Sequence, residues 1–493
     1  MQDFLFQVQR RSPTSLQTQI RQVLVSAILA GQLPADKRIP STRAMSKILG
    51  VSRNTVLHAY RGLVETGYLL AKDRSGYYVN CEIPEKNTFN ANLIDPSNIE
   101  GMHQPIKFRV KPTLQQNIQK PSNWHRYPYP FIYGQIDPKH FPIAEWRECS
   151  RQGLSTKSLD VWTGDVQDQD DPMLVEQIRT RLLPRRGILA SPDEILITMG
   201  AQNALYLLAS LLVTEQTTVA IEEPGYPDAH NIFDLNTKRI IPIGVDEQGI
   251  IVDSRLDLCD ILFVTPSHQF PTTVTLTRER RERLVDKAAD KGIIIIEDDY
   301  EFEANYLNQP TPALKSMDRG GNVIYVGSLS KTFFPGLRIG FLVGPRELIA
   351  EARALRRLMI RHPPCNNQRT TALFLSLGHH DAILNRFNRI FHARWKKMGQ
   401  ALKEHMPNST RAPSFGGSCY WVCGPEDLDS KRLAQEALQE GIIIEQGGIF
   451  FSAPGYPKNY FRLGFSSIEK QQIEPGIKLL AQLINKQIKD RSN

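Results

Sequence analysis

Apolar residues between positions 14 and 30 recur at the spacing of a helix. In the stretch TSLQTQIRQVLVSAILA they fall on one face from Leu16 to Ile28, and Gly31 follows at the point where a helix would end. The pattern predicts one amphipathic helix near the start of the chain.

Two shorter helices and a hairpin are predicted next. Ser41 is a good N-cap for one short helix, and Ser52 is a good N-cap for a second that runs to about Thr66. Gly50 supplies the turn between them, which is the outline of a helix-turn-helix. The following GYLLAKDRSGYYV predicts two short strands around a polar tip. Residues 1–80 are therefore predicted to form a winged helix.

From about Ser191 onward, short apolar runs alternate with longer helical segments. The runs are EILIT, TTVAIEE, DILFV, GIIIIEDD, NVIYVGS and IGFLVG, and helices are predicted from Ala201 and from Arg278 to Asp290. Alternation of this kind predicts a mostly parallel sheet covered by helices, which is an α/β fold. Ligands of such sheets bind at the carboxyl ends of the strands.

The periodicity disappears between residues 81 and 127. This stretch holds five prolines, six asparagines and four glutamines, a composition typical of loops. It predicts a linker between the winged helix and a body over residues 128–493. Two alternatives remain open: a flexible tether, or a loop that packs on the body through apolar residues such as Phe108 and Val110.

The overall composition supports this division and excludes some classes of protein. The chain has 493 residues, of which 41% are hydrophobic and 23% charged, as in globular proteins with several domains. The longest apolar stretch is too short to span a membrane and the N-terminus lacks the pattern of a secretory signal, so we expect a cytoplasmic protein. The six cysteines lack zinc-ligand spacing, and no metal site is predicted.

Positive charge is concentrated in the first eighty residues. They hold eleven Lys or Arg against four acidic residues, which accounts for most of the net charge of +8. A basic winged helix predicts a polyanionic partner, here double-stranded DNA. The second helix of the motif carries Arg53, Asn54 and Thr55 in its first turn, where a recognition helix meets base edges.

Residues 16–79 resemble the GntR-type winged helix along their whole length. The resemblance is carried by GQLP, by IPSTRAMSKILGVSRNTVLHAYRGLVETGYL and by GYYV. It implies DNA contacts from six residues, namely Arg43, Ser52, Arg53, Thr55, Lys72 and Gly76. The arginines and Lys72 are expected to contact phosphates, which makes the affinity for DNA dependent on salt.

Polar residues follow four of the predicted strands of the body. They are Gly200, Ala201 and Gln202 after EILIT, Ser267, His268 and Gln269 after DILFV, Asp298 and Tyr300 after IIIIE, and Ser328, Ser330 and Lys331 after VIYVG. The four groups are expected to converge at one edge of the sheet.

A pyridoxal phosphate site needs this combination of groups. A lysine forms the Schiff base with the aldehyde, and a carboxylate keeps the pyridine nitrogen protonated. Backbone N–H groups at a helix start favour the phosphate, and the residues expected there are Gly200, Ala201, Gln202, Ser328, Ser330 and Arg338. Tyr226 is expected to lie flat on the ring, and Tyr300 to hydrogen-bond its phenolic oxygen.

Two other interpretations of these motifs have less support. The pair Lys331 and Thr332 could belong to a phosphate-binding loop of the nucleotide-binding type, but no glycine stands at the required spacing upstream. The run EDDY could bind magnesium, but the lysine motif favours pyridoxal chemistry.

From about Phe131 to Ser466 the chain resembles a fold-type I aminotransferase. With its winged helix it resembles the MocR/GabR subgroup of GntR-family regulators. The motifs that carry the resemblance are FIYGQIDPKHFPIAEW, ITMGAQNALYLLA, EEPGYPDAH, TPSHQFPT, IIEDDYEFE, GSLSKTFFPGLRIGFLV and YFRLGFS.

The resemblance implies specific roles. Lys331 is the catalytic lysine that carries pyridoxal 5′-phosphate, Asp298 pairs with the pyridine nitrogen, and Tyr300 pairs with the ring oxygen. Arg462 grips the carboxylate of an amino acid in a bidentate pair. The resemblance also implies a homodimer with its sites at the interface, and a smaller C-terminal α+β part over about 366–493.

Two segments depart from the aminotransferase pattern. The run Phe270-Pro271-Thr272-Thr273 lacks the asparagine that usually touches the cofactor ring, and His268 or Gln269 is expected to replace it. The run DVQDQDDPMLVEQI has acids before Pro172, and Val175 where an arginine is expected, so the pattern does not define the shape of the ligand near that loop.

Two functions fit this combination of domains. The first is a transcriptional regulator that binds DNA through the winged helix and senses an amine or amino acid through the cofactor on Lys331. The second is a working aminotransferase for which DNA binding is secondary. The basic winged helix and the missing asparagine favour the first. A third hypothesis, that pyridoxal phosphate itself is the signal, leaves Arg462 without a role.

Overall fold

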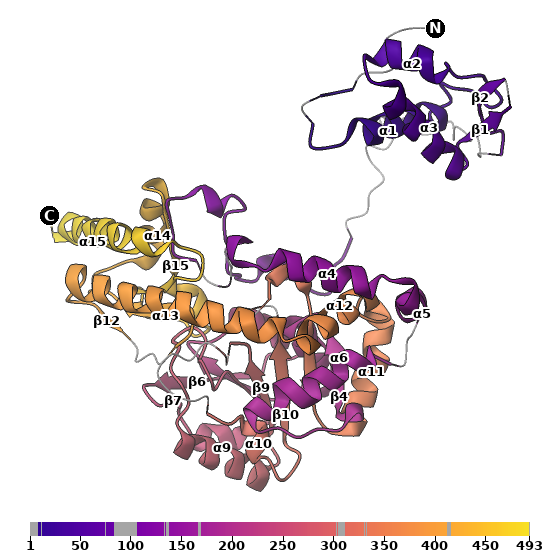
Figure 1. Cartoon of the computed structure of the whole chain (residues 1–493). Coiled ribbons are helices and arrows are strands. Elements are labelled where there is room, and N and C mark those ends of the chain that lie inside the picture. The colour runs from indigo at the N-terminus through magenta and orange to yellow at the C-terminus, as the bar shows by residue number, and fades with distance from the viewer. Residues whose placement is uncertain are drawn as a thin grey trace. The chain divides into compact units, whose positions relative to one another are not determined.

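The computed structural model describes residues 8–10, 12–73, 75–82, 106–132, 134, 138–165, 169–301, 303, 311–329, 331, 333–411 and 416–492. The chain divides into two compact units, residues 1–108 and residues 109–493, both drawn in Figure 1. No helix within the described ranges is long and apolar enough to cross a lipid bilayer.

The described residues of the first unit form α1 (Leu16–Leu29), α2 (Thr42–Leu49), α3 (Arg53–Glu65), β1 (Leu69–Lys72) and β2 (Gly76–Val79). The predicted caps are present: the hydroxyl of Ser41 accepts the amide of Ala44, and that of Ser52 accepts the amide of Thr55. Gly50 ends α2 with φ of 61°, a left-handed conformation that favours glycine. The two strands pair antiparallel, and the predicted winged helix is confirmed.

The apolar stripes of the three helices meet in one core. Ile20 and Leu24 from α1, Met45 from α2 and Leu63 from α3 are all buried there. The core thereby holds α3 against α1 and α2 and leaves the basic residues of the helices on the outside.

The second unit is built on an eight-stranded sheet. Its strands are β4 (Ile195–Thr198), β5 (Val219–Glu223), β6 (Ile240–Asp246), β7 (Gly249–Ile250), β8 (Ile261–Val264), β9 (Ile294–Asp299), β10 (Val323–Ser328) and β11 (Gly340–Val343), in the order β4-β11-β10-β9-β8-β5-β6-β7. The five strands from β10 to β6 run parallel, whereas β11 and β7 pair antiparallel with their neighbours. The predicted α/β class is confirmed.

Helices cover the sheet because its strands are apolar on both faces. One buried cluster joins it to α7 (Ala201–Leu212), α8 (Pro227–Asp234) and α11 (Arg346–Ile360), and a second joins it to α9 (Arg278–Lys291) and α10 (Leu314–Met317). Further helices are α4 (Ile143–Gly153), α5 (Leu159–Thr163), α6 (Pro172–Gln177) and a π-helical turn at Ile178–Leu182. Short 3-10 turns lie at Pro112–Leu114, Trp124–Arg126, Pro138–His140, Thr156–Ser158, Leu183–Arg186, Pro192–Glu194, Ser254–Leu258, Pro335–Leu337 and Gly447–Phe450.

The C-terminal part adds α12 (Cys365–Ser376), α13 (His379–His405), α14 (Ser430–Gln439) and α15 (Lys470–Ser492). Its four-stranded sheet has the order β12 (Thr410–Arg411), β13 (Cys419–Cys423), β16 (Tyr460–Gly464) and β15 (Glu445–Gln446). The long α13 packs along α15 (Figure 1). A separate pair joins β14 (Ile442–Ile443) to β3 (Tyr129–Pro130), so the segment that enters the body is tied to its C-terminal part.

The segment composed like a linker lies partly on the body. Residues 109–127 belong to the second unit. Gln115 donates a side-chain hydrogen bond to the carbonyl of Asn231 at 3.1 Å, and the Asn231 amide donates to the carbonyl of Gln116 at 2.8 Å. Ile118 packs against a buried aromatic cluster, whereas Val110 is exposed. Residues 83–105 lie outside the described part.

The acids that depart from the aminotransferase pattern have structural partners. Asp170 forms ion pairs with Arg353 at 2.7 Å and Arg356 at 2.6 Å. Asp171 caps α6 by accepting the amide of Leu174, and it pairs with Arg369 at 2.7 Å. These carboxylates hold the start of α6 to α11 and α12, which explains why acids stand in this run.

Candidate functional site

A cavity of about 480 Å³ opens where the strands of the large sheet end. Its lining comes from residues far apart in the sequence: Ile118, Lys120, Ala201, Gln202, Tyr226, Asp228, Thr265, Phe270, Asp298, Tyr300, Ser328, Lys331, Pro335 and Arg338. Residues that follow β4 and β10 meet there with Asp298 from β9. The group expected after β8, namely Ser267, His268 and Gln269, is not part of this lining, and Thr265 and Phe270 lie there instead.

Lys331 reaches this cavity with its amine next to Gly134. A Cβ atom placed on Gly134 would lie 2.5 Å from the Nζ of Lys331, so a side chain there would force the amine to move. Burial, together with the positive charge of Lys120, lowers the pKa of Lys331 to about 8. A lowered pKa increases the fraction of neutral amine, which is the nucleophilic form.

Asp298 presents a buried carboxyl to the same cavity. It is 3% exposed, and its Oδ1 accepts no hydrogen bond from the described part of the chain. Burial and the neighbouring Asp299 raise its pKa to about 7, against an opposing effect from Lys331. A buried carboxyl with an open acceptor fits a protonated ring nitrogen, which would supply both the hydrogen bond and the positive charge.

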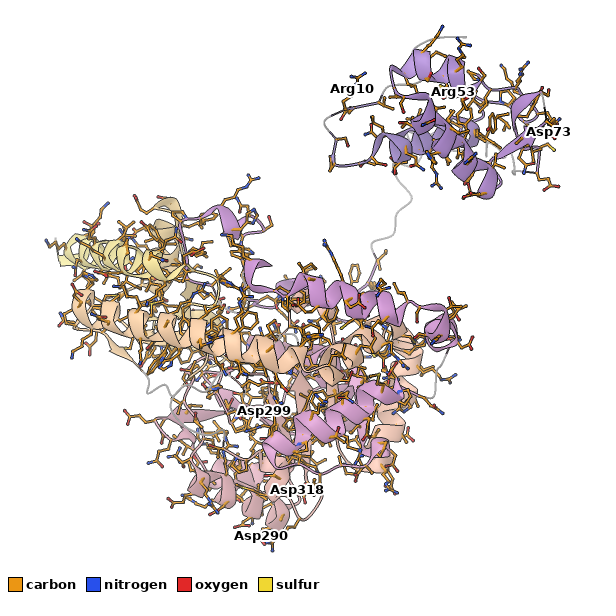
Figure 2. The ribbon with its side chains drawn as sticks, in the orientation of Figure 1. Arg10, Arg53, Asp73, Asp290, Asp299 and Asp318 are labelled. Atoms are coloured by element: carbon orange, nitrogen blue, oxygen red, sulfur yellow. The ribbon has the colours of Figure 1, made fainter. Side chains whose placement is uncertain are left out.

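The next residue, Asp299, has a different environment. Its carboxylate pairs with the buried Arg186 at 2.6 Å and accepts the hydroxyl of Tyr325 at 2.8 Å. Arg186 also donates to the hydroxyl of Ser267. Figure 2 labels Asp299 within the body. Of the two adjacent acids, Asp298 therefore faces the cavity while Asp299 belongs to a structural ion pair.

The residues expected at the phosphate lie at the start of α7. Gly200 caps this helix with φ of 83°, and a Cβ there would lie 3.0 Å from a terminal nitrogen of Arg338. Arg338 donates to the carbonyl of Met199 at 2.8 Å. Ala201, Gln202, Ser328 and Arg338 line the cavity, and Ser330 lies outside the described residues. A helix N-terminus beside an arginine suits a phosphate group.

Two tyrosines line the aromatic side of the cavity. Tyr226 donates to the carboxylate of Asp228 at 3.0 Å and meets the ring of Phe270 edge to face at 5.0 Å. Gln202 donates to the same Asp228 oxygen at 2.7 Å. Tyr300 donates its hydroxyl proton to the carbonyl of His268 at 2.7 Å. Asp228 was not among the residues singled out from the sequence.

The position of the missing asparagine is surrounded by other side chains. Thr265 and Phe270 line the cavity, while His268 is buried and does not belong to its described lining. Burial lowers the pKa of His268 to about 4, which keeps its ring neutral. Gln269 donates to the carboxylate of Glu222 and to the carbonyls of Pro224 and Phe270, so its amide supports the loop.

Arg462 lies behind the cavity and is fully buried. Its Nε donates to Glu445 at 2.6 Å, and its Nη2 lies 2.5 Å from the same carboxylate oxygen. The two residues face each other on β15 and β16. The guanidinium also stacks over the rings of Phe270 at 4.3 Å and Phe450 at 4.8 Å. The arginine expected to hold a ligand carboxylate thus binds a carboxylate of its own chain.

Lys120 is a second cavity residue that the sequence analysis did not single out. Its Nζ lies 3.8 Å from Glu445. Burial lowers its pKa and so does Arg462, while Glu445 opposes them. It comes from the segment that composition indicated as a linker, where an isolated lysine carries no sequence signal.

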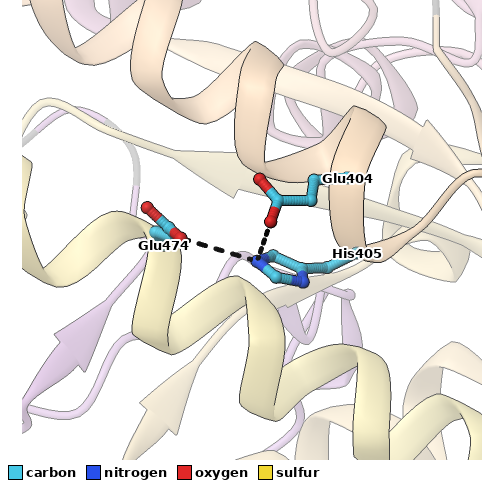
Figure 3. Close-up of side chains that lie close together, drawn as sticks. All are labelled: Glu404, His405 and Glu474. Atoms are coloured by element: carbon cyan, nitrogen blue, oxygen red, sulfur yellow. Dashed lines mark ion pairs between the residues drawn. The ribbon is translucent and has the colours of Figure 1, made fainter.

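A separate cluster joins α13 to α15 at the far end of the C-terminal part. The Nε2 of His405 lies 3.9 Å from a carboxylate oxygen of Glu404 and 3.9 Å from one of Glu474 (Figure 3). Lys397 also pairs with Glu474. The Lys397–Glu474 ion pair joins the two helices, so Glu474 among these three potential metal ligands has a counter-charge within the chain.

The residues expected to contact DNA lie on the surface of the first unit. Arg43, Ser52, Arg53 and Lys72 are exposed, and Thr55 and Gly76 are half-buried. Figure 2 labels Arg53, which opens α3. Ser52 caps that helix, and Lys72 lies 4.6 Å from the centre of the Tyr78 ring. The first turn of α2, the first turn of α3 and the hairpin therefore each carry an exposed cation.

Comparisons with known families match the winged helix and the body separately. Residues 16–79 match the family described as bacterial regulatory proteins, gntR family, and residues 144–480 match aminotransferase class I and II. The Pyrococcus horikoshii kynurenine aminotransferase is 27% identical with a TM-score of 0.70 over 74% of this chain and 93% of that one. The Thermus thermophilus alpha-aminoadipate aminotransferase LysN is 26% identical with a TM-score of 0.68 over 74% and 94%.

Two regulators match along nearly the whole chain. The HTH-type transcriptional regulator TauR of Rhodobacter capsulatus is 40% identical over 95% of this chain and 96% of its own length. The probable rhizopine catabolism regulatory protein MocR of Rhizobium meliloti is 29% identical over 96% and 94%. The chain therefore belongs to the GntR family of bacterial transcriptional regulators, in the MocR-type branch that joins a winged helix to a domain of the class I and II aminotransferase family.

Proposed function

We propose that this regulator binds pyridoxal 5′-phosphate in the cavity around Lys331 and senses an amine or amino acid there. The observation that carries the proposal is that Lys331 shares one cavity with Asp298, a buried carboxyl with an open acceptor. Two aminotransferases of similar fold support it, because LysN was solved with N-(5′-phosphopyridoxyl)-L-leucine and the kynurenine aminotransferase with PMP. When bound, pyridoxal phosphate supplies an aldehyde that condenses with amines.

The residues of the cavity suit the parts of this cofactor. The amine of Lys331 would attach it covalently, and Asp298 would hold the proton of its ring nitrogen. The backbone at Gly200 and Ala201, together with Arg338, would bind the phosphate, with Gln202, Ser328 and Ser330 beside them. Tyr226 would cover the ring of the cofactor. The hydroxyl of Tyr300 would lie beside the phenolic oxygen of the cofactor and orient the ring. His268 would act only through the backbone carbonyl that holds Tyr300.

The winged helix would read DNA through α3 and the hairpin. Thr55 in the first turn of α3 would reach the major groove, where Arg53 would contact a phosphate at its edge, while Arg43, Ser52, Lys72 and Gly76 would also contact the backbone. An amine that reacts in the cavity can change DNA binding only if it favours one arrangement of the protein over another. We propose a homodimer, so that two winged helices read two half-sites.

A second function, turnover as an aminotransferase, is favoured by one observation. The lysine with a lowered pKa, the buried aspartate and the arginine expected for a carboxylate all lie in or against one cavity. Steady production of a keto acid from an amino donor, abolished by Lys331→Ala, would support the enzyme. A single slow half-reaction without turnover would support the regulator.

Two variants test the division of roles. Lys331→Ala should lose the visible absorption of the bound cofactor and keep its basal affinity for DNA. Arg53→Ala should keep the cofactor and lose about tenfold in DNA affinity, with a salt slope smaller by about one. Loss of both properties in either single variant would contradict the proposal. A wild-type protein that stays colourless with excess cofactor would overturn it.

A further inference from the structure

A third extended segment lies along the hairpin that follows α3, on the side of β2 opposite to β1. In this segment, residues 36–39, the amide of Ile39 donates to the carbonyl of Tyr77 at 3.0 Å. Arg38 and Tyr78 are paired directly in antiparallel orientation. The segment therefore holds Arg38 against the hairpin, although the two are far apart in the sequence.

The alternation of side chains along these strands separates a core face from an outer face. Ile39 is buried in the core of the winged helix, and Tyr77 packs against that core. Arg38 is next to Ile39 and paired with Tyr78, so it lies on the outer face. Lys72 lies on this face too, because its Nζ is 4.6 Å from the centre of the Tyr78 ring.

The guanidinium of Arg38 lies beside Gly76, where β2 begins. A Cβ atom added to Gly76 would lie 3.4 Å from the Nε of Arg38 and 3.5 Å from its Nη2. Lys72 pairs with Gly76 across the two strands of the hairpin, so two cations flank this glycine. Lys72 and Gly76 are both proposed to contact DNA, whereas the family resemblance assigns no role to Arg38.

Arg38 has no counter-charge within the described part of the chain. Its side chain is exposed, and among the described residues it forms neither an ion pair nor a side-chain hydrogen bond. Arg10 of the same unit, by contrast, donates to the carbonyl of Gly50 at 2.6 Å. The planar guanidinium of Arg38 can therefore turn its N–H donors to the acceptors of a bound nucleic acid.

The position of the hairpin beside α3 determines which part of a duplex Arg38 meets. α3 and β1 pack against each other, so the hairpin is fixed next to the helix. When the first turn of α3 lies in the major groove, the hairpin crosses the neighbouring backbone, and the groove beyond that backbone is the minor groove. Narrow minor grooves of A·T runs have an enhanced negative potential that attracts arginine.

We propose that Arg38 enters the minor groove that flanks the half-site and makes the regulator prefer A·T base pairs there. This inference rests on the proposed contacts of Lys72 and Gly76 with DNA. The minor groove distinguishes A·T from G·C pairs but not A·T from T·A, so the preference is for narrow A·T runs and not for one sequence. Arg38 thereby adds a second source of specificity to the base contacts of α3.

The test compares wild-type protein with the variants Arg38→Ala, Arg38→Lys and Lys37→Ala. Lys37 is the matched control, because it is the adjacent exposed cation and alternation turns its side chain to the other side of the strand. Wild-type protein first enriches its preferred half-site from a pool of duplexes with a randomised centre. That half-site is then placed between A·T runs or between G·C runs, and the affinity of each full-length protein for both duplexes is measured.

We expect wild-type protein and Lys37→Ala to bind the duplex with A·T flanks about tenfold more tightly than the duplex with G·C flanks, comparable to the contribution of one base pair. Arg38→Ala should lose most of this preference, because its affinity falls for the A·T-flanked duplex alone. Arg38→Lys should keep part of the preference, since it retains the charge. Thermal unfolding of Arg38→Ala should match that of the wild type, as expected for an exposed side chain.

An equal loss of affinity for both duplexes in Arg38→Ala would make Arg38 a phosphate contact without a role in specificity, and the inference would be wrong. It would also be wrong if Arg38→Ala kept the full preference or if the wild type had none. If wild-type protein enriched no half-site at all, the proposed reading of DNA by the winged helix would be rejected instead.

Discussion

At the scale of single residues, the cavity contains ionisable groups whose burial is unfavourable when no ligand is bound. Asp298 is a buried carboxyl with an open acceptor, and Lys331 is an amine whose pKa is lowered by burial. Both groups approach neutrality as a result, since burial penalises their charged forms. A cationic ring nitrogen would reverse this for Asp298 and make the ionised carboxylate the stable form.

The first expectation concerns the stability of the cofactor-free protein against pH. Asp298 has a pKa of about 7 in the folded state, above the value of about 3.9 for an unfolded aspartate. Between these values the folded chain binds the additional proton, so this residue lowers the free energy of unfolding as pH rises. Asp298→Asn removes the effect, which amounts to at most about 1.4 kcal/mol per pH unit.

Urea unfolding of the cofactor-free protein at pH 5, 6 and 7 measures this difference. The free energy of unfolding of Asp298→Asn should fall less steeply with pH than that of the wild type. Some decline remains in both proteins, because burial also raises the pKa values of Glu222 and Glu297 to about 7. Asp193→Asn, a change at an exposed carboxyl, serves as the control. Parallel declines in the wild type and Asp298→Asn would show that Asp298 is ionised in the folded state.

The second expectation concerns Gly134. An alanine there would place its Cβ 2.5 Å from the Nζ of Lys331, at a φ of 74° that also strains it. Gly134→Ala should therefore displace the lysine and abolish cofactor uptake, measured by visible absorption. Gly292→Ala is the matched control, because Gly292 has a φ of 70° and no atom within 4 Å of its Cβ position. It should cost about 1 kcal/mol of stability and leave uptake intact.

At the scale of elements, the sequence predicts the positions of those site residues that lie at the ends of regular strands and helices. Strand ends converge in a parallel sheet, so Ala201, Asp298 and Lys331 could be expected together from the order of strands and helices along the chain. Lys120, Asp228 and Glu445 could not, because they come from a segment without periodicity, the first turn of the short helix α8 and an edge strand of two residues. Their positions depend on tertiary packing, which leaves no local signal.

Ser52 has two expected roles, as the N-cap of α3 and as a DNA contact, and two substitutions separate them. As the N-cap of α3 it accepts the amide of Thr55, and Ser52→Ala should destabilise the start of the helix by about 1 kcal/mol. Ser52→Asp should retain the cap but repel phosphates. In the full-length protein, Ser52→Ala should weaken the protection of the α3 amides against hydrogen exchange, and Ser52→Asp should restore it. The DNA affinity of Ser52→Asp should nevertheless fall below that of Ser52→Ala.

Ser41→Ala is the matched control for that experiment, since Ser41 caps α2 in the same way. It should destabilise α2 by a similar amount with a smaller effect on DNA affinity. If Ser52→Asp bound DNA as tightly as the wild type, Ser52 would lie outside the DNA interface and its role would be the cap alone.

At the scale of the whole molecule, we predict that a second copy binds at the end of α11, where three apolar side chains are exposed. The last residues of α11, Leu358, Met359 and Ile360, are exposed by 76%, 41% and 37%. Three adjacent apolar side chains at a helix end are unusual on a free surface and typical of a protein interface. A homodimer that covers them would bring two winged helices to one DNA duplex, which raises the affinity through the linkage of two binding events.

The substitution Leu358→Asp tests this interface. A carboxylate buried against apolar residues of a second copy is strongly unfavourable, so sedimentation should show dissociation into monomers at concentrations where the wild type is dimeric. DNA with two half-sites should then bind at least tenfold more weakly, while DNA with one half-site binds as before. Leu189→Asp is the control, because Leu189 is 91% exposed and a charge there should change neither measurement. If Leu358→Asp stayed dimeric while Leu189→Asp dissociated, the interface would lie on the surface around Leu189.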